Sequence, residues 1–303
     1  MKKFFIILKS AFNIIWKTIA FLLLTYAVVF SVAGTVVIIY AYNYVMKPLR
    51  EVKVLKTSNP QETAYMIQYK KELSMKQLSD TLIQTYIPID SISPYLKSAV
   101  LAAEDDGFYT HPGFDLEAIF SAYEYNKARG KVKRGASTIT QQLAKNLFLD
   151  NNRNFERKGK ELAYTLLMER YLGKERILEL YLNYAQWGKN IFGCEAAAKQ
   201  YFKKSSRNLS RAESARLAAV LAMPSKVSPT NAHSQFIAKR VAVIANNLYL
   251  HGAISDSGYL NLTGVLPPRK NDSMYTDSTK INTVNSLQDT LKSMNVSDKP
   301  VNR

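Results

Sequence analysis

A chain of 303 residues is long enough for one large domain or two modest ones. Its 41 Lys and Arg residues outnumber its 24 Asp and Glu residues and give a formal net charge of +17. This balance indicates an anionic partner, such as nucleic acid, a membrane surface or a phosphorylated substrate. The single cysteine, Cys194, excludes an intramolecular disulfide.

The N-terminal region predicts a membrane anchor. Residues 18–46 contain no charged side chain, and residues 21–40 are almost entirely apolar. A helix needs about 20 such residues to cross a hydrocarbon core. A signal peptide with a weak cleavage site near Ala33 is the alternative, but its apolar region would run to only about 7–15 residues. Lysines lie on both sides of the span, so charge alone leaves its orientation nearly balanced.

Helical periodicity dominates the rest of the chain. Apolar residues recur at helical spacing in residues 63–82, 93–103, 162–172, 196–202, 210–221 and 236–252. Pro94 stands at a first-turn position, and residues 210–213 form a capping box. The proline rule predicts that residues 87–90 are extended, and Gly188 and Gly193 are expected to bracket a loop. Because no run alternates convincingly between apolar and polar residues, we predict a mainly α-helical body.

These features divide the chain into five parts. We expect a short basic N-terminus at residues 1–17, the transmembrane anchor at 18–46 and a juxtamembrane linker at 47–60. A folded domain is expected at 61–263. The segment 264–303 is rich in Ser, Thr, Asn and Lys, so we expect a polar and largely disordered tail.

Two acids follow an apolar run at the end of the helix predicted over residues 93–103. Glu104 and Asp105 come directly after residues 99–103, which read as a buried helix end. Partial burial at this boundary raises the pKa of a carboxyl group and makes it a better proton acceptor near neutral pH. The sequence therefore predicts an acid–base site at this point.

Hydroxyl, amide and cationic side chains follow further along the chain. Residues 135–149 are rich in hydroxyls and amides and carry one cation, Lys145, a composition that suits a sugar or a phosphate better than a packed core. The basic residues at 127–134 form either a solvated face or an anion-binding surface. Glu161 lies beside Arg157, Lys158 and Lys160, cations that would keep its carboxylate ionised.

Five segments together resemble the peptidoglycan glycosyltransferase family, which polymerises glycan in bacterial cell-wall synthesis. They occur in the family's order, at residues 104–115, 135–146, 157–161, 176–183 and 209–225. One such match would be weak, whereas five in order are specific. Bifunctional members carry a transpeptidase domain after this region, and this sequence ends at Arg303, so we expect the monofunctional branch.

The resemblance implies a lysozyme-like helical fold behind a single transmembrane helix, with the catalytic domain outside the cytoplasmic membrane. Lipid II and the growing lipid-linked glycan are the implied substrates. Other cell-wall synthesis or division proteins are possible partners, and nucleic acid is not expected. The reaction joins a sugar hydroxyl of lipid II to the anomeric carbon of the donor, with inversion, and releases a polyprenyl pyrophosphate.

The resemblance also implies roles for individual residues. Glu104 is the implied base, and Glu161 is the second essential carboxylate, which organises cations or a divalent ion (Mg or Mn) near the pyrophosphate. Placed cations stabilise the charge that develops on a leaving group. The implied substrate-binding residues are Asp105, Thr138, Gln142, Lys145, Asn146, Arg157 and Lys158.

Other interpretations remain open. A lysozyme-type glycosidase also uses paired carboxylates, but it has no need of the cations between residues 135 and 158. A silent membrane-anchored scaffold would have no reason to retain both Glu104 and Glu161. For Phe108 and His111 we expect packing and a structural hydrogen bond, and for Tyr181 and Asn183 a role in holding their helix.

Overall fold

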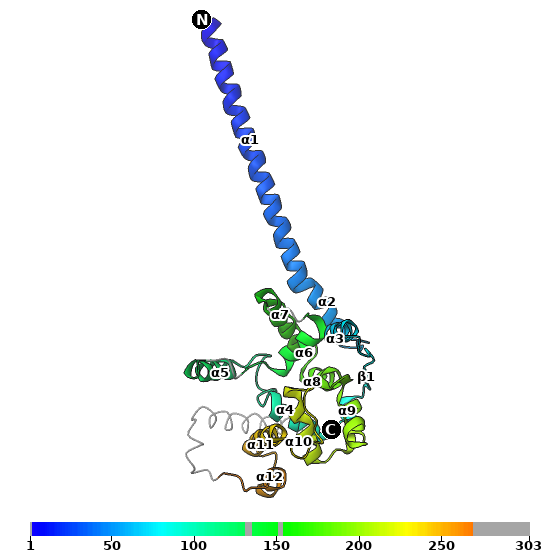
Figure 1. The fold of residues 1–303 in the computed structure, drawn as a ribbon. Helices are drawn as coiled ribbons and strands as arrows, with labels where there is room; N and C mark the ends of the chain where they lie inside the picture. The colour runs from blue at the N-terminus through cyan, green and yellow to red at the C-terminus, as the bar shows by residue number, and fades with distance from the viewer. Residues whose placement is uncertain (1, 131–134, 151–153, 269–303) are drawn as a thin grey trace, which may run out of the picture. The chain divides into compact units, whose positions relative to one another are not determined.

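The computed structural model describes residues 2–130, 135–150 and 154–268. The chain divides into two compact units, residues 1–54 and 55–303. Figure 1 shows that both units are built almost entirely of helices. The predicted mainly α-helical class is thus confirmed. The expected disorder after Gly264 concerns a segment that lies, from residue 269 on, outside the described residues.

The first unit is one long helical segment. Helix α1 spans Lys2–Ala41, a π-helical turn η1 spans Tyr42–Met46, and helix α2 spans Lys47–Val54. Within it, an 18-residue window reaches a mean hydropathy of 2.4 and none of that window is buried. The segment is therefore long and apolar enough to cross a membrane, as predicted for residues 18–46. The helix also includes the basic N-terminus and the first half of the expected linker at 47–60.

The second unit contains ten α-helices within the described residues. Their bounds are α3 Ala64–Met75, α4 Pro94–Glu104, α5 Leu116–Ala128, α6 Ile139–Phe148, α7 Phe155–Tyr171, α8 Lys174–Tyr184, α9 Cys194–Phe202, α10 Arg211–Ala219, α11 Gln235–Leu250 and α12 Asp256–Thr263. Three short 3-10 helices connect them: η2 Ile89–Ser91, η3 Ser206–Asn208 and η4 Val220–Ala222.

Local signals explain several helix ends. Ser210 and Glu213 form the predicted capping box of α10, and Pro94 occupies the first turn of α4. Gly173, with a φ of 78°, separates α7 from α8, because glycine adopts this positive φ without steric strain. The extended segment predicted at residues 87–90 is wrong in its second half, because Ile89 begins the 3-10 turn η2.

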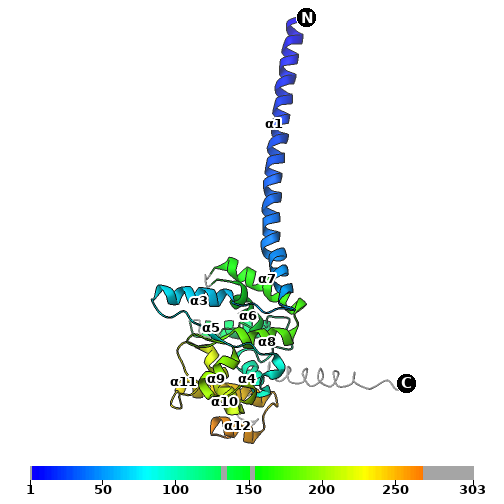
Figure 2. The ribbon, with the colours of Figure 1, turned by 90° about the vertical axis from the view of Figure 1, so that its right-hand side faces the viewer.

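The helices of the second unit pack in two groups. Helix α4 packs against α10 and α11, and α12 packs against α10 and α11. Helix α6 packs against α3, α7 and α8. Figure 2 shows these two groups one below the other. The C-terminal end of α4, which carries Glu104, meets α6, which carries Gln142, where the two groups adjoin. This contact brings the acids after α4 next to the polar residues of α6.

A small three-stranded sheet corrects the predicted loop between Gly188 and Gly193. Strand β2 (Gln186–Gly188) pairs antiparallel with β3 (Ile191–Phe192), and β1 (Ile83–Gln84) pairs parallel with β3. Strands of two or three residues are too short for an alternating pattern to emerge from the sequence. The sheet buries Trp187 and Phe192 completely, so this segment is part of the core.

Candidate active site

Glu104 lies at the last residue of α4, and two other helices bind its carboxylate. Gln142 of α6 donates from Nε2 to Oε2 at 3.1 Å. Arg240 of α11 donates from Nη2 to Oε1 at 3.0 Å and to the carbonyl oxygen of Ala103, also at 3.0 Å. The side chain of Glu104 is 13% exposed. Its carboxylate is therefore oriented from both sides while part of it stays accessible.

The surroundings of Glu104 raise its pKa. Burial is the largest cause, and the negative charge of Asp105 adds to it. The hydrogen bond from Gln142 and the charge of Arg240 act in the opposite direction without cancelling the effect of burial. The predicted upward shift is confirmed. The environment is less purely apolar than the sequence indicated, because a cation from α11 contacts the carboxylate.

Asp105 faces into the protein, and hydrogen bonds occupy both of its oxygens. Oδ1 lies 2.8 Å from Nε2 of His111, and Oδ2 accepts from the backbone N–H of Ile139 at 2.9 Å. The Gly113 N–H donates to Nδ1 of His111, so the ring proton sits on Nε2 and points at Asp105. The predicted structural hydrogen bond of His111 is confirmed. Asp105 connects segment 104–115 to the start of α6.

Helix α6 carries most of the predicted substrate-binding residues. Thr138 is its N-cap and forms a capping box with Gln141, while its hydroxyl donates to the Gly113 carbonyl at 2.7 Å. Gln142 follows one turn later, and Lys145 and Asn146 follow at the next turn on the same face. Lys145 and Asn146 are half-buried. Substrate contact by these residues stays a prediction.

Glu161 forms a second cluster on α7. Its side chain is buried, Arg157 donates from Nη1 to its Oε2 at 2.9 Å, and Lys158 donates to its Oε1. The cationic surroundings predicted for Glu161 are thus confirmed. Because α7 packs against α6, the two clusters belong to neighbouring helices. Of the predicted basic run at residues 127–134, residues 131–134 lie outside the described residues.

Among residues 2–130, 135–150 and 154–268, no three His, Cys, Asp or Glu side chains converge as metal ligands. The oxygens of Glu161 are each bound by a cationic side chain, which disfavours a direct metal contact there.

Two residues of the site, Arg240 and Tyr181, were not predicted from the sequence to contact Glu104 or Gln142. The sequence pattern predicts only an amphipathic helix around Arg240, and 136 positions separate this residue from Glu104. Tyr181 was expected only to hold its helix, yet its hydroxyl donates to Oε1 of Gln142 at 3.0 Å. Tyr181 lies in the family segment 176–183, but no sequence signal links Tyr181 or Arg240 to the Glu104 carboxylate, because both contacts depend on tertiary packing. Asn183 has the expected structural role, binding the backbone of Ile87.

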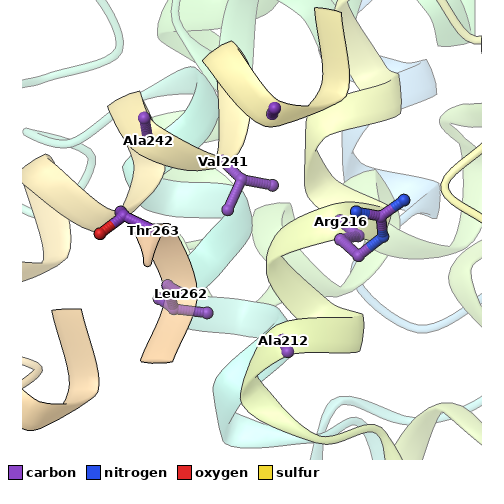
Figure 3. A pocket seen from close by; sticks show the side chains of 7 residues that line it. Ala212, Arg216, Val241, Ala242, Leu262 and Thr263 are labelled. Carbon is purple, nitrogen blue, oxygen red and sulfur yellow. The ribbon is translucent and has the colours of Figure 1, made fainter. Parts of the chain in front are cut away.

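A pocket of about 150 Å³ lies away from these residues, between α10, α11 and α12 (Figure 3). It is lined by Ala212, Arg216, Ala238, Val241, Ala242, Leu262 and Thr263. Its one charged side chain, Arg216, donates to the carbonyl oxygens of Pro229 and Asn231. The lining includes none of the carboxylates or cations described above, so no role in the site is assigned to it.

A half-buried carboxylate with a raised pKa and a neighbouring cation cluster suit acid–base chemistry on a substrate that carries negative charge, and the N-terminal helix is long and apolar enough to span a membrane. The family comparison agrees, since the transglycosylase family model matches residues 71–249. The chain belongs to this family and is a glycosyltransferase of peptidoglycan synthesis.

Relatives support the same assignment. A protein named biosynthetic peptidoglycan transglycosylase from Paraburkholderia phytofirmans is 44% identical over 190 residues, covering 63% of this chain and 79% of the relative. One of the same name from Ralstonia nicotianae is 45% identical over 195 residues, covering 63% and 83%. A third, from Cupriavidus pinatubonensis, is 52% identical over 139 residues, covering 46% and 55%.

Proposed function

We propose that the chain polymerises glycan strands from lipid II. A sugar hydroxyl of lipid II attacks the anomeric carbon of a glycan held on undecaprenyl pyrophosphate. The new carbon–oxygen bond forms as the bond to pyrophosphate breaks, and undecaprenyl pyrophosphate leaves with the electron pair. Attack from the opposite face inverts the anomeric carbon and gives a β-1,4 linkage. The proposed activity is this glycosyl transfer alone.

Glu104 is the proposed base. A neutral hydroxyl is a poor nucleophile, so a base must take its proton as the bond forms. The observation that carries this role is the half-buried carboxylate with a raised pKa, oriented by Gln142 and Arg240. A raised pKa makes this carboxylate a better acceptor for the hydroxyl proton.

The Glu161 cluster is proposed to act on the leaving group. Negative charge grows on the pyrophosphate as it departs, and preorganised cations stabilise that charge. Glu161 holds Arg157 and Lys158 on α7, and Lys145 lies on the neighbouring α6. A divalent cation (Mg or Mn) bound to the pyrophosphate would add to the positive charge that these residues supply, and a chelator added to the assay tests whether the reaction needs one.

We also propose that the helix of the first unit anchors the chain in the cytoplasmic membrane, with the second unit on its outer side. Lipid-linked wall precursors are polymerised there, and a short basic N-terminus favours the cytoplasm. Protease treatment of intact spheroplasts tests this orientation. Degradation of the catalytic unit supports it, and protection until lysis contradicts it.

The test of the reaction uses the full chain in detergent with labelled lipid II. The wild type should give a ladder of long glycan on a polymer-resolving gel, and Glu104→Gln should lose it. Glu124→Gln, which changes an exposed acid of α5, is the matched control and should keep the ladder. Short soluble fragments from preformed glycan would instead indicate a hydrolase. Lipid II binding without any product would indicate a scaffold.

A further inference from the structure

The Gln142 side chain that contacts Glu104 is itself held by a buried tyrosine. Tyr181 lies on α8, is 2% exposed and donates its hydroxyl proton to Oε1 of Gln142. The other end of the same amide donates from Nε2 to Glu104. Three helices, α8, α6 and α4, thus supply consecutive members of one hydrogen-bonded chain. Each bond in it has a defined direction.

The direction of these bonds matters because a glutamine amide has two ends of opposite character. Its NH₂ group only donates and its carbonyl only accepts. When Glu104 is ionised it needs a donor, which the NH₂ group supplies. When Glu104 has taken a proton, it could donate to the carbonyl instead, provided that the amide turned over. A turned amide would stabilise the protonated form and make Glu104 harder to ionise.

We infer that Tyr181 is a positioning residue for the base: its hydroxyl keeps the Gln142 amide turned so that the NH₂ group faces Glu104 throughout the reaction. This inference rests on the proposed role of Glu104. If the amide turned over, its NH₂ group could donate to the Tyr181 oxygen, but the buried hydroxyl proton would lose the Oε1 acceptor that it has now. The tyrosine thereby disfavours the arrangement that stabilises protonated Glu104.

Tyr181 is suited to this task over a wide pH range. Burial raises its pKa well above the ordinary value, and the carboxylates of Glu104 and Asp105 raise it further, against the opposing charge of Arg240. The hydroxyl therefore keeps its proton at neutral pH and remains a donor there. Among the described residues, Gln142 from α6 and Arg240 from α11 contact Glu104, Asp105 is next to it in the chain, and Tyr181 from α8 lies behind Gln142.

The test is the pH dependence of kcat/KM in Tyr181→Phe, a variant that removes only the hydroxyl. The acidic limb of the profile should move to higher pH by roughly half to one unit, the equivalent of one hydrogen bond. On the alkaline side of the limb the rate should approach that of the wild type. A shift of the limb is a signature that a merely structural role would not produce.

Tyr184→Phe is the matched control. Tyr184 lies on the same helix, is also buried at 2% exposure, and donates its hydroxyl to the Pro60 carbonyl at 2.6 Å, outside the chain that leads to Glu104. Its loss should leave the acidic limb in place. If both variants lower the rate equally at every pH, Tyr181 is only structural and the inference is overturned.

A double substitution tests whether Tyr181 acts through Gln142. In a Gln142→Met background the amide is absent, so adding Tyr181→Phe should move the limb no further. An additional shift would contradict the inference. The proposed base is tested separately by Glu104→Gln. If Glu104→Gln still polymerises glycan, Glu104 is not the base and the proposed function fails. If Glu104→Gln is inactive but Tyr181→Phe leaves the acidic limb in place, only the proposed role of Tyr181 fails.

Discussion

Arg240 on α11 donates to Oε1 of Glu104 at 3.0 Å across 136 positions of the sequence. The same helix reaches the end of α4 a second time, where Asn247 donates to the Ala102 carbonyl at 2.9 Å. The last carbonyls of a helix have no partner within it, so α11 satisfies groups that α4 leaves open. Helix α11 therefore fixes the position from which Glu104 projects.

We expect Arg240→Gln to alter the pH profile of catalysis. Arg240 lowers the pKa of Glu104, so its removal should raise that pKa further. The acidic limb of kcat/KM should move up by about one unit, with a roughly tenfold loss on the acidic side. Arg207→Gln, which changes an exposed arginine of η3, serves as the control. A uniform loss at every pH would assign Arg240 to binding or stability instead.

Glu161→Gln should separate the second carboxylate from the base. The variant keeps the shape of the side chain but removes the charge that pairs with Arg157 and Lys158. With these cations no longer held, we expect kcat/KM to fall by about 100-fold while the acidic limb stays where it is. Glu156→Gln breaks an exposed pair with Lys160 on the same helix and should change little. A displaced acidic limb in Glu161→Gln would contradict this division of roles.

Gly193→Ala should destabilise the second unit. Gly193 has a φ of +79°, and an added Cβ would lie 2.8 Å from the backbone oxygen of Asn183. Strained backbone and the clash together should cost about 3 kcal/mol and lower Tm by roughly 6–12 °C. Gly130→Ala is the control, since Gly130 also has a positive φ, +61°, but open space around it. Equal decreases in Tm for the two variants would show that the contact with the Asn183 oxygen adds no cost, and would contradict the prediction.

Stability should depend on pH through Glu195. Burial alone would raise its pKa, but the Ser206 N–H and the donors on Lys199 and Ser205 outweigh burial and hold the pKa below the ordinary value of 4.5. A lowered pKa contributes stability above the unfolded pKa, and this stability is lost as the pH falls through the folded one.

Glu195→Gln should therefore unfold more easily than the wild type at pH 7, by about 1–3 kcal/mol. The difference should shrink below pH 4.5, as the wild-type carboxylate takes up its proton. Thermal unfolding of both proteins from pH 7 down to 3.5 measures this, with Glu124→Gln as an exposed control. A difference that stays constant over that range would refute the pH linkage.

Local patterns predict several of the helices, and together with the family resemblance they point to Glu104 and to the Glu161 cluster. Apolar spacing located α4 and α11, and the capping box located the start of α10. The sheet was missed because its strands are only two or three residues long. Arg240 and Tyr181 were missed as partners of the site because side chains from separate helices meet only after packing. Sequence spacing carries no information on that meeting.

The hydrogen bonds of Asp105 and Thr138 to the segments before and after α5 have a consequence for how this part of the chain can evolve. Asp105 binds the Ile139 N–H and Thr138 binds the Gly113 carbonyl, so the chain is fastened at both ends of the stretch between them. Helix α5, which lies in that stretch, buries only Ala122 and stands apart from the other helices in Figure 1. Because neither of these hydrogen bonds involves α5, we expect substitutions within α5 to leave the position of the Glu104 carboxylate unchanged. The sequence of α5 can therefore change during evolution while the residues around Glu104 keep their positions.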